Sequence, residues 1–232
     1  MPRIRSDAAE VAAKKILDMI NDHKLVTGDS VSDMELSRDF EMSRTPIREG
    51  IITLIEAGVL ERTRTKVVVK SVTMDDVIEI LDVRDAIERK TIEIIFERDL
   101  LTEEKIQKLQ CSEDMLAKNI KEGNFDANFN SDTEFHQTLI SFAENQRFVD
   151  IYNRLSLQFS RLRWMTMLTP SRYVETKSEH QVIIDTLKTG DMDKSIKAAN
   201  SHIIKTKENY NEILTSSYWN HIADEIKRMK QS

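Results

Sequence analysis

Apolar residues recur every three to four positions in three short blocks near the start of the chain, a spacing that is typical of amphipathic helices. Residues whose side chains cap helices precede these blocks, namely Asp7, Ser32 and Ser43. Pro46 falls in the first turn of the third block, where a missing N–H costs little, and Gly58 is a natural helix stop. Two β-branched runs then predict a pair of short strands. The predicted helices cover residues 7–23, 33–40 and 44–57, and the predicted strands cover 59–62 and 66–70.

The order of helix, helix, tight turn, helix and β-hairpin predicts a winged helix-turn-helix domain. In such a domain the third helix reads DNA base edges in the major groove with its N-terminal residues, which here are Ser43, Arg44, Thr45 and Arg48. Arg44 and Arg48 lie four residues apart and share one helical face, and an arginine can hold guanine bidentately or contact phosphate. The alternative from spacing alone is a small helical domain with a solvated basic face.

From residue 71 onward the helical spacing continues in longer blocks joined by short breaks. Short connections between helices make neighbours antiparallel. The predicted fold class is therefore mainly α, with a winged helix-turn-helix domain over residues 1–70 and an all-helical antiparallel bundle over residues 71–232. The predicted helices of this bundle cover residues 77–99, 102–122, 126–143, 146–168, 172–188 and 191–214.

Charge is distributed unevenly along the chain. The formal net charge is −6, yet residues 43–70 hold six basic and three acidic side chains, whereas residues 71–232 hold 22 basic and 28 acidic ones. A small basic region on an acidic body is typical of a protein whose DNA contact is confined to one end. The single Cys111 excludes a disulfide framework, and no apolar run approaches the roughly 18 residues of a membrane span. We therefore expect a cytoplasmic protein without membrane contact, associated with the nucleoid when it is bound to DNA.

Three histidines and an aspartate occupy suggestive positions in the predicted bundle. Asp132 and His136 are one helical turn apart and project from the same face. His180 lies ten residues before Gly190 and His202 twelve after it, so both are roughly 15 to 18 Å from the same turn. We expect all four side chains to meet in one layer, where they would suit a divalent ion such as Zn²⁺, Ni²⁺ or Mn²⁺. The alternative is that these are hydrogen-bonded core histidines, because a D-x-x-x-H pattern often arises by chance.

The N-terminal motifs resemble those of the GntR family of bacterial transcription regulators. The similarity rests on Glu35-Leu36-Ser37, on the run SRTPIRE over residues 43–49, and on EAGVL over residues 56–60. The resemblance implies that Arg44, Thr45 and Arg48 contact operator DNA, and that Arg64 or Lys66 reaches the minor groove from the wing.

The later segments are similar to the FCD ligand-binding domain of the FadR subfamily. The similar segments are residues 132–136, 178–180 and 198–203. In the metal-binding members the ligands match Asp132, His136, His180 and His202, beside a cavity for a small organic acid. The resemblance also places Arg84 at this cavity, where its guanidinium would hold a carboxylate; the alternative is an i, i+4 ion pair with Glu88.

Together these patterns predict a ligand-responsive transcription regulator, which we expect to be a repressor and not an enzyme. It would act as a homodimer on a palindromic operator, because each chain supplies one recognition helix. The bundle would sense a small carboxylate-bearing metabolite beside its metal ion.

Two alternatives remain from the sequence. The first is a metal-dependent hydrolase on a helical bundle. It lacks a clearly placed general base, because we expect Glu134 and Glu179 to face away from the predicted ligands. The second is a regulator whose signal is the metal ion itself.

Overall fold

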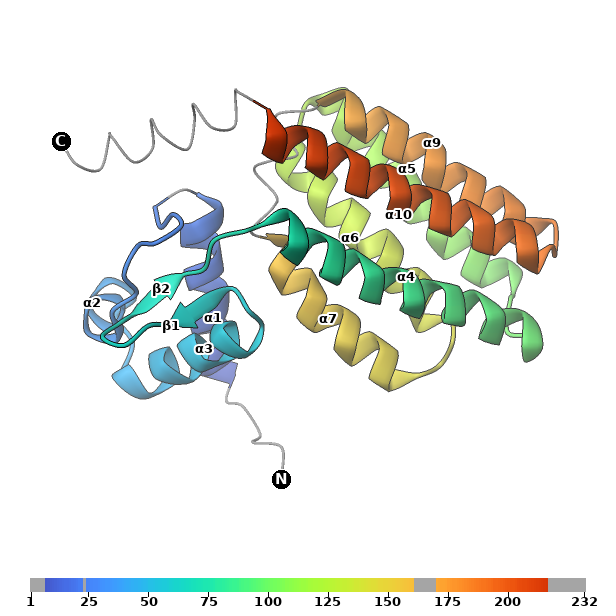
Figure 1. Cartoon of the computed structure of the whole chain (residues 1–232). Helices are drawn as coiled ribbons and strands as arrows, with labels where there is room; N and C mark the ends of the chain where they lie inside the picture. Colours follow the sequence, from blue (N-terminus) through green and yellow to red (C-terminus); the bar gives the residue numbers. More distant parts are fainter. Residues whose placement is uncertain (1–6, 23, 161–169, 217–232) are drawn as a thin grey trace. The chain divides into compact units, whose positions relative to one another are not determined.

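A computed structural model describes residues 7–22, 24–160 and 170–216. The chain forms two compact units (Figure 1). The first unit holds the described residues up to Val72 together with the end of α7 (Gln146–Ser160) from Arg154 onward. The second unit holds the remaining described helices. Among the helices in these ranges, none is both long enough and apolar enough to cross a membrane.

The first unit contains the three predicted helices, which are α1 (Asp7–Asn21), α2 (Asp33–Asp39) and α3 (Arg44–Glu56). Ser32 caps α2 by accepting a hydrogen bond from the backbone N–H of Glu35. Ser43 stands at the N-cap position of α3 as expected, although its side chain makes no capping hydrogen bond. The helix-turn-helix pattern of the sequence is therefore confirmed.

Helices α1 and α3 pack closely because Gly50 faces the backbone of α1. A Cβ atom placed on Gly50 would lie 2.9 Å from the backbone nitrogen of Ala13 and 3.1 Å from the Cβ of Ala12. Only glycine allows this approach, so α3 is held at a fixed depth on α1. The core around this contact is aliphatic and includes Ile16, Ile47, Leu54, Val59 and Leu60.

The wing is a short antiparallel hairpin of β1 (Leu60–Arg62) and β2 (Val67–Val69), with Leu60 opposite Val69. The turn between the strands closes when the N–H of Thr63 donates to the carbonyl of Lys66 over 2.8 Å. Arg64 and Thr65 therefore form the tip of the wing.

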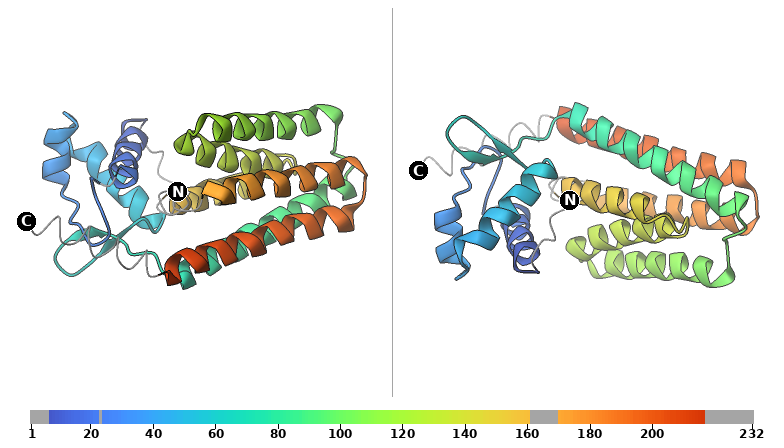
Figure 2. Two further views of the ribbon diagram at one scale, coloured as in Figure 1. Left: turned by 90° about the horizontal axis from the view of Figure 1, so that it is seen from above. Right: turned by 90° about the horizontal axis from the view of Figure 1, so that it is seen from below.

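The second unit is a bundle of antiparallel helices (Figure 2). Helix α4 packs along α10, α5 packs along α6, and α9 packs against both α5 and α10. Phe135, Leu139, Ile183 and Leu187 are fully or almost fully buried in its core. Besides the first part of α7, its helices are α4 (Met74–Glu97), α5 (Glu103–Glu122), α6 (Phe125–Ser141), α9 (Pro170–Lys188) and α10 (Met192–Thr215).

The helix ends follow the sequence signals with one difference. Thr73 and Asp76 form a capping box at the start of α4, and Gly190, with φ +73°, lies between α9 and α10. The predicted helices leave a break over residues 169–171, but Pro170 is the first residue of α9, a position that tolerates a missing N–H. The predicted continuation of α7 over residues 161–168 lies outside the described residues.

Candidate DNA-binding surface and metal centre

The six side chains predicted to contact DNA are all exposed on the first unit. They lie in two groups, one at the N-terminal end of α3 and one at the wing. Because α3 begins at Arg44, its first turn presents cations and hydroxyl groups together. The first group is Ser43, Arg44, Thr45 and Arg48, and the second is Arg64 and Lys66.

Arg44 and Arg48 share one partner, the carboxylate of Asp33 at the first residue of α2. Arg44 donates from Nη2 to Asp33 Oδ2 over 2.8 Å, and Arg48 donates from Nε to the same oxygen. The hydrogen bonds from Arg48 and Arg44 hold the pKa of Asp33 below its usual value. The two arginines therefore lie side by side on the exposed face of α3.

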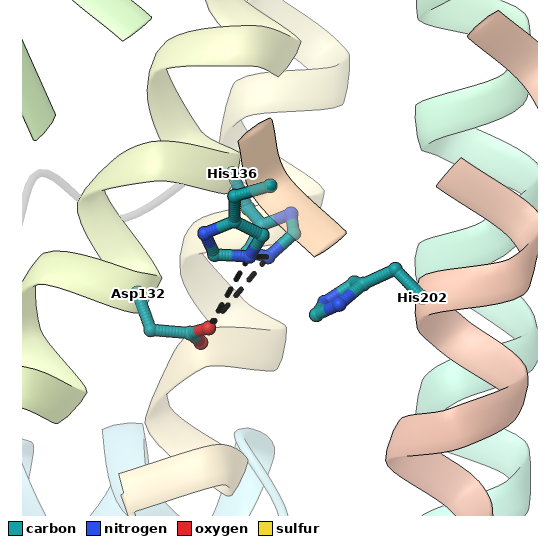
Figure 3. A group of neighbouring side chains, drawn as sticks. Asp132, His136 and His202 are labelled. Carbon is teal, nitrogen blue, oxygen red and sulfur yellow. Dashed lines mark hydrogen bonds and ion pairs between the residues drawn. The ribbon is translucent and has the colours of Figure 1, made fainter. Parts of the chain in front are cut away.

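Four side chains of the second unit meet in its interior. Asp132 and His136 project from α6 toward His202 on α10 (Figure 3), and His180 reaches the same point from α9. One potential ligand atom from each residue lies within 4.8 Å of the other three. The three imidazoles are buried, whereas the side chain of Asp132 keeps 25% of its exposure. We call these four residues the metal cluster.

The separations among His136, His180 and Asp132 are close to those of ligands on one shared ion, and no two ligand atoms of the metal cluster are more than 4.8 Å apart. His180 Nε2 lies 3.1 Å from His136 Nε2 and 3.6 Å from Asp132 Oδ1. Two ligands that each lie about 2.0–2.2 Å from a zinc ion are roughly 2.8–3.6 Å apart at octahedral or tetrahedral angles. His136 Nε2 lies 3.9 Å from Asp132 Oδ1, slightly beyond this range. Three imidazole nitrogens and one carboxylate are also a donor set that divalent transition metals prefer.

A different glutamate contacts the other ring nitrogen, Nδ1, of each histidine in the metal cluster. A metal-binding histidine usually has its second ring nitrogen on a carboxylate, which fixes the tautomer and points the free lone pair at the ion. We call these three glutamates the outer carboxylates. His180 contacts Glu113 over 3.0 Å and His202 contacts Glu179 over 2.8 Å, both with hydrogen-bond geometry. His136 Nδ1 lies 2.9 Å from Glu88, an ion-pair distance, but it makes no hydrogen bond in the described part of the chain.

Burial keeps His180 and His202 in the form that binds metals. It lowers the pKa of His180 well below its usual value, and the charges of neighbouring groups add to this effect. It also lowers the pKa of His202 to about 4, although the hydrogen bond with Glu179 opposes the change. Both imidazoles are therefore neutral at pH 7, and coordination to a metal requires a neutral imidazole.

The outer carboxylates differ in their surroundings. Burial by itself would raise the pKa of Glu179, but hydrogen bonds from His202 and Arg172 outweigh it and lower this pKa to about 2. For Glu113, burial raises the pKa to about 8, and the charge of Asp132 adds to this effect. Glu113 Oε1 is buried without a hydrogen-bond partner in the described part of the chain.

Acidic groups exceed basic groups around the metal cluster. Three carboxylates, those of Asp132, Glu88 and Glu179, lie near two guanidinium groups, those of Arg84 and Arg172. The fourth carboxyl group, Glu113, is mostly protonated at pH 7 because burial raises its pKa to about 8. A bound cation would offset the negative excess and favour ionisation of Glu113, which makes the surroundings fit the predicted ligand set.

Arg84 is buried beside the metal cluster, with 3% of its surface exposed. Its Nε donates to Glu88 Oε1 over 2.7 Å, so the i, i+4 ion pair considered from the sequence is present. Its Nη2 also lies 3.2 Å from His202 Nε2. Arg84 therefore touches both an outer carboxylate and a cluster histidine, while its contact with an effector stays a prediction.

The expectation that Glu179 faces away from the predicted ligands is wrong. Helix α9 lies between α5 and α10, so two of its faces are buried. His180 points to Glu113 on α5, while Glu179 points to His202 on α10. Glu134, in contrast, is exposed, as its angular position on α6 predicts.

Sequence reasoning missed Glu113, although the sequence carries a signal for it. In α5 the buried aliphatic positions are Ile106, Leu109 and Leu116. Glu113 lies four residues after Leu109 and three before Leu116, and so shares their face. A carboxylate on the apolar face of a helix needs a buried partner, which is a reason to search for a histidine or a metal.

Two family models match the chain. The model for the FCD domain matches residues 79–205, and the model described as "Bacterial regulatory proteins, gntR family" matches residues 8–68. The metal cluster and the outer carboxylates all fall within the first range, and the exposed residues at α3 and the wing fall within the second.

Known proteins are similar to the chain over most of its length. The chain is 26% identical over 190 residues to the HTH-type transcriptional repressor RspR of Escherichia coli, with 82% of each chain covered. It is 25% identical over 177 residues to the gluconate operon transcriptional repressor of Bacillus licheniformis, covering 74% of this chain and 72% of that one. The solved structure of E. coli McbR/YncC has the same fold, with a TM-score of 0.75 at 16% identity over 89% of this chain and 99% of that one.

Proposed function

Because the chain belongs to the GntR family of transcription regulators and carries an FCD domain, we propose that it represses transcription as a homodimer on a palindromic operator and is controlled by a small carboxylate beside a divalent metal ion. The functional division falls at residues 70 and 71, with DNA binding before it and effector binding after it. Its DNA target places its action in the cytoplasm, on the nucleoid.

The proposed DNA contacts rest on the exposed face of α3 and on the wing. Arg44, Thr45 and Arg48 would enter the major groove with Ser43 at the start of the helix, while Arg64 or Lys66 would reach the neighbouring minor groove. All six side chains are exposed. Two copies related by a twofold axis would read two half-sites, which is why the operator is expected to be palindromic.

The single observation that best supports a metal ion is the contact of each cluster histidine with its own buried glutamate. Core histidines need only one hydrogen-bond partner, whereas a carboxylate beside each of three neighbouring imidazoles is the arrangement expected around a bound metal ion. Here all three Nδ1 atoms contact carboxylates while His136 and His180 bring their Nε2 atoms within 3.1 Å of each other. Asp132, His136, His180 and His202 would hold the ion, which would supply a positive charge and open coordination positions.

Arg84 links the proposed ion to the proposed effector. Its Nη2 lies within hydrogen-bonding distance of His202 Nε2, and that nitrogen has only one lone pair. A cation on this lone pair would displace the hydrogen bond and leave the Arg84 donor to a carboxylate ligand nearby. Metal binding should therefore come before effector binding.

The two alternative functions are a metal-dependent hydrolase and a regulator that senses the metal ion itself. The relatives are regulators and repressors by name, which favours a regulator over a hydrolase. A hydrolase would also need a general base. Glu179 contacts the cluster but is hydrogen-bonded to His202 and Arg172, so it is a poor general base. The binding assay described next distinguishes a regulator that senses the ion itself from one that senses a carboxylate effector.

The test is a binding assay between the purified full chain and a duplex selected by this chain from a random DNA library. A panel of two- to six-carbon hydroxy acids and dicarboxylic acids is added to metal-loaded and metal-stripped protein. We expect at least one acid to change duplex affinity by about 5- to 150-fold, the usual range of allosteric coupling, and only in loaded protein. If stripping the metal alone produces the full change, the ion is the signal; if no acid acts on loaded protein, the proposed effector class is wrong.

Replacing Glu179 with glutamine should weaken metal binding, because the neutral amide no longer holds His202 as the carboxylate does. Loss of such a carboxylate typically lowers metal affinity about 10- to 100-fold. The matched control is Glu175→Gln on the same helix, since the Glu175 side chain is 64% exposed and lies 3.5 Å from Arg172 without contacting a cluster histidine in the described part of the chain. Zinc affinity is measured by competition with a chromophoric chelator. Equal affinities in the two variants would show that Glu179 does not support the ion.

A further inference from the structure

Asp33 connects the two arginines that dominate the proposed DNA-reading surface. Its Oδ1 accepts a hydrogen bond from Arg44 Nη2 over 2.9 Å, and its Oδ2 accepts from Arg44 Nε over 3.2 Å and from Arg48 Nε. The Asp33 side chain is 22% exposed, whereas those of Arg44 and Arg48 are 51% and 61% exposed. The carboxylate is thus more buried than the two arginine side chains that donate to it.

This arrangement has little value for stability. Exposed ion pairs usually contribute little to stability, because water screens the charges and two long side chains lose freedom. The same arrangement matters more for recognition. An arginine that is already held in one rotamer has less conformational entropy to lose when it binds.

A basic hollow adjoins Asp33 between α3 and the wing. It encloses about 440 Å³ and is lined by Arg48, Arg62 and Lys66 together with the hydroxyl groups of Ser30, Ser32 and Thr65. Asp33 is the one acidic residue among its lining residues in the described chain. Cations and hydroxyl groups of this kind attract phosphate groups from DNA of any sequence.

Phosphate and guanine compete for the same arginines, but only phosphate is charged. A carboxylate next to the arginines repels an approaching phosphate, while it leaves the neutral O6 and N7 acceptors of guanine almost unaffected. The anion should therefore weaken sequence-independent binding more than it weakens base recognition.

We propose that Asp33 is a specificity-determining residue, which orients Arg44 and Arg48 toward base edges and prevents DNA phosphates from capturing them. This inference rests on the proposed role of α3 in operator binding. Asp33 itself need not touch DNA; it acts through the two arginines that it holds.

The test compares the full chain with its Asp33→Asn variant on two DNA probes. One probe is a duplex that the wild-type chain selects from a random library, and the other is a scrambled duplex of the same composition. For Asp33→Asn we expect tighter binding of the scrambled duplex than the wild type shows. The affinity ratio, which is the affinity for the selected duplex divided by that for the scrambled duplex, should be about tenfold smaller than in the wild type. The plot of log affinity against log salt for the scrambled duplex should steepen by about 0.9, the value for one additional neutralised phosphate.

The matched control is Asp39→Asn at the other end of α2. Asp39 is also acidic and half-exposed, but its carboxylate pairs with Arg38 on its own helix. The control changes the net charge by the same amount and should keep the wild-type affinity ratio. Far-UV circular dichroism verifies that both variants keep their helices, and Asp33→Glu, which retains the charge, should keep scrambled-duplex affinity near that of the wild type.

The outcomes separate this inference from the proposed function. An unchanged affinity ratio in Asp33→Asn, or an equal fall in Asp39→Asn, overturns the role of Asp33 while operator binding stands. A wild-type chain that shows no preference among duplexes overturns operator binding itself, and the role of Asp33 with it.

Discussion

Replacement of His180 with alanine is expected to remove the bound metal ion almost completely. The change deletes the imidazole whose Nε2 lies 3.1 Å from His136 Nε2 and 3.6 Å from Asp132 Oδ1. Loss of a supporting carboxylate alone typically costs about 10- to 100-fold in metal affinity, so loss of a ligand should cost about a thousandfold or more. Elemental analysis after dialysis against zinc should therefore find close to one ion per wild-type chain and almost none in the variant.

The same experiment has a second readout in thermal unfolding. A ligand that binds only the folded state stabilises it, by about 4 kcal/mol when its concentration is a thousand times its dissociation constant. Added zinc should raise the Tm of the wild-type chain and leave that of His180→Ala unchanged. Gln181→Ala, the neighbouring position on α9, should respond like the wild type, because its side chain contacts Gln110 and Asp185 away from the metal cluster.

His180→Ala also removes packing, because its ring stacks on Phe135 with 3.9 Å between centroids. Asp132→Asn avoids this problem, since the side chain keeps its shape and is partly exposed. It should keep the apo Tm and still lose most of the zinc. Full zinc content in both variants would show that the metal cluster does not hold the ion.

The sequence predicted the meeting of the four cluster residues from helix geometry alone. Asp132 and His136 share a helical face through their spacing, and the structure places them together on α6. His180 and His202 lie at similar distances from Gly190, and antiparallel packing of α9 and α10 brings them to one level. Such inferences succeed because rise per residue and antiparallel connection fix the height of a side chain in a bundle.

The outer carboxylates were harder to predict because they depend on rotation about each helix axis. Adjacent residues differ by about 100° around a helix, so a helix with one buried face would turn Glu179 away from the side of His180. Helix α9 has two, one toward α5 and one toward α10. The packing of the whole bundle decides which faces of a helix are covered. The periodicity of a single segment does not reveal this.

Contacts between side chains on the surface of the first unit were also harder to predict than the helices that carry them. Motif and cap positions located α3, and the structure confirms it with Arg44 as its first residue. The role of Asp33 could not be inferred from spacing, because Asp33 lies 11 residues before Arg44 and 15 before Arg48. Its contact with them depends on the angle between α2 and α3, which the short turn sets.

Replacing both Arg44 and Arg48 with alanine is expected to abolish sequence-specific DNA binding. A bidentate contact between arginine and guanine contributes about 1–3 kcal/mol of discrimination, so loss of two should lower affinity for a selected duplex by about a hundredfold or more. The plot of log affinity against log salt should also become shallower, because two cations that can neutralise phosphate are gone. Fluorescence anisotropy with a labelled duplex at several salt concentrations measures both effects.

Arg38→Ala supplies the control for this experiment. Arg38 lies on α2 in the same unit, its side chain is 78% exposed, and it pairs with Asp39. Its loss removes a positive charge without changing the N-terminal end of α3, so it should weaken selected and scrambled duplexes alike and only slightly. Zinc content should stay at the wild-type level in all these variants, because Asp132 and the three histidines lie in the other unit. If the double variant binds the selected duplex within threefold of the wild type, α3 is not the recognition helix, and the basic wing with Arg64 and Lys66 must carry the contact instead.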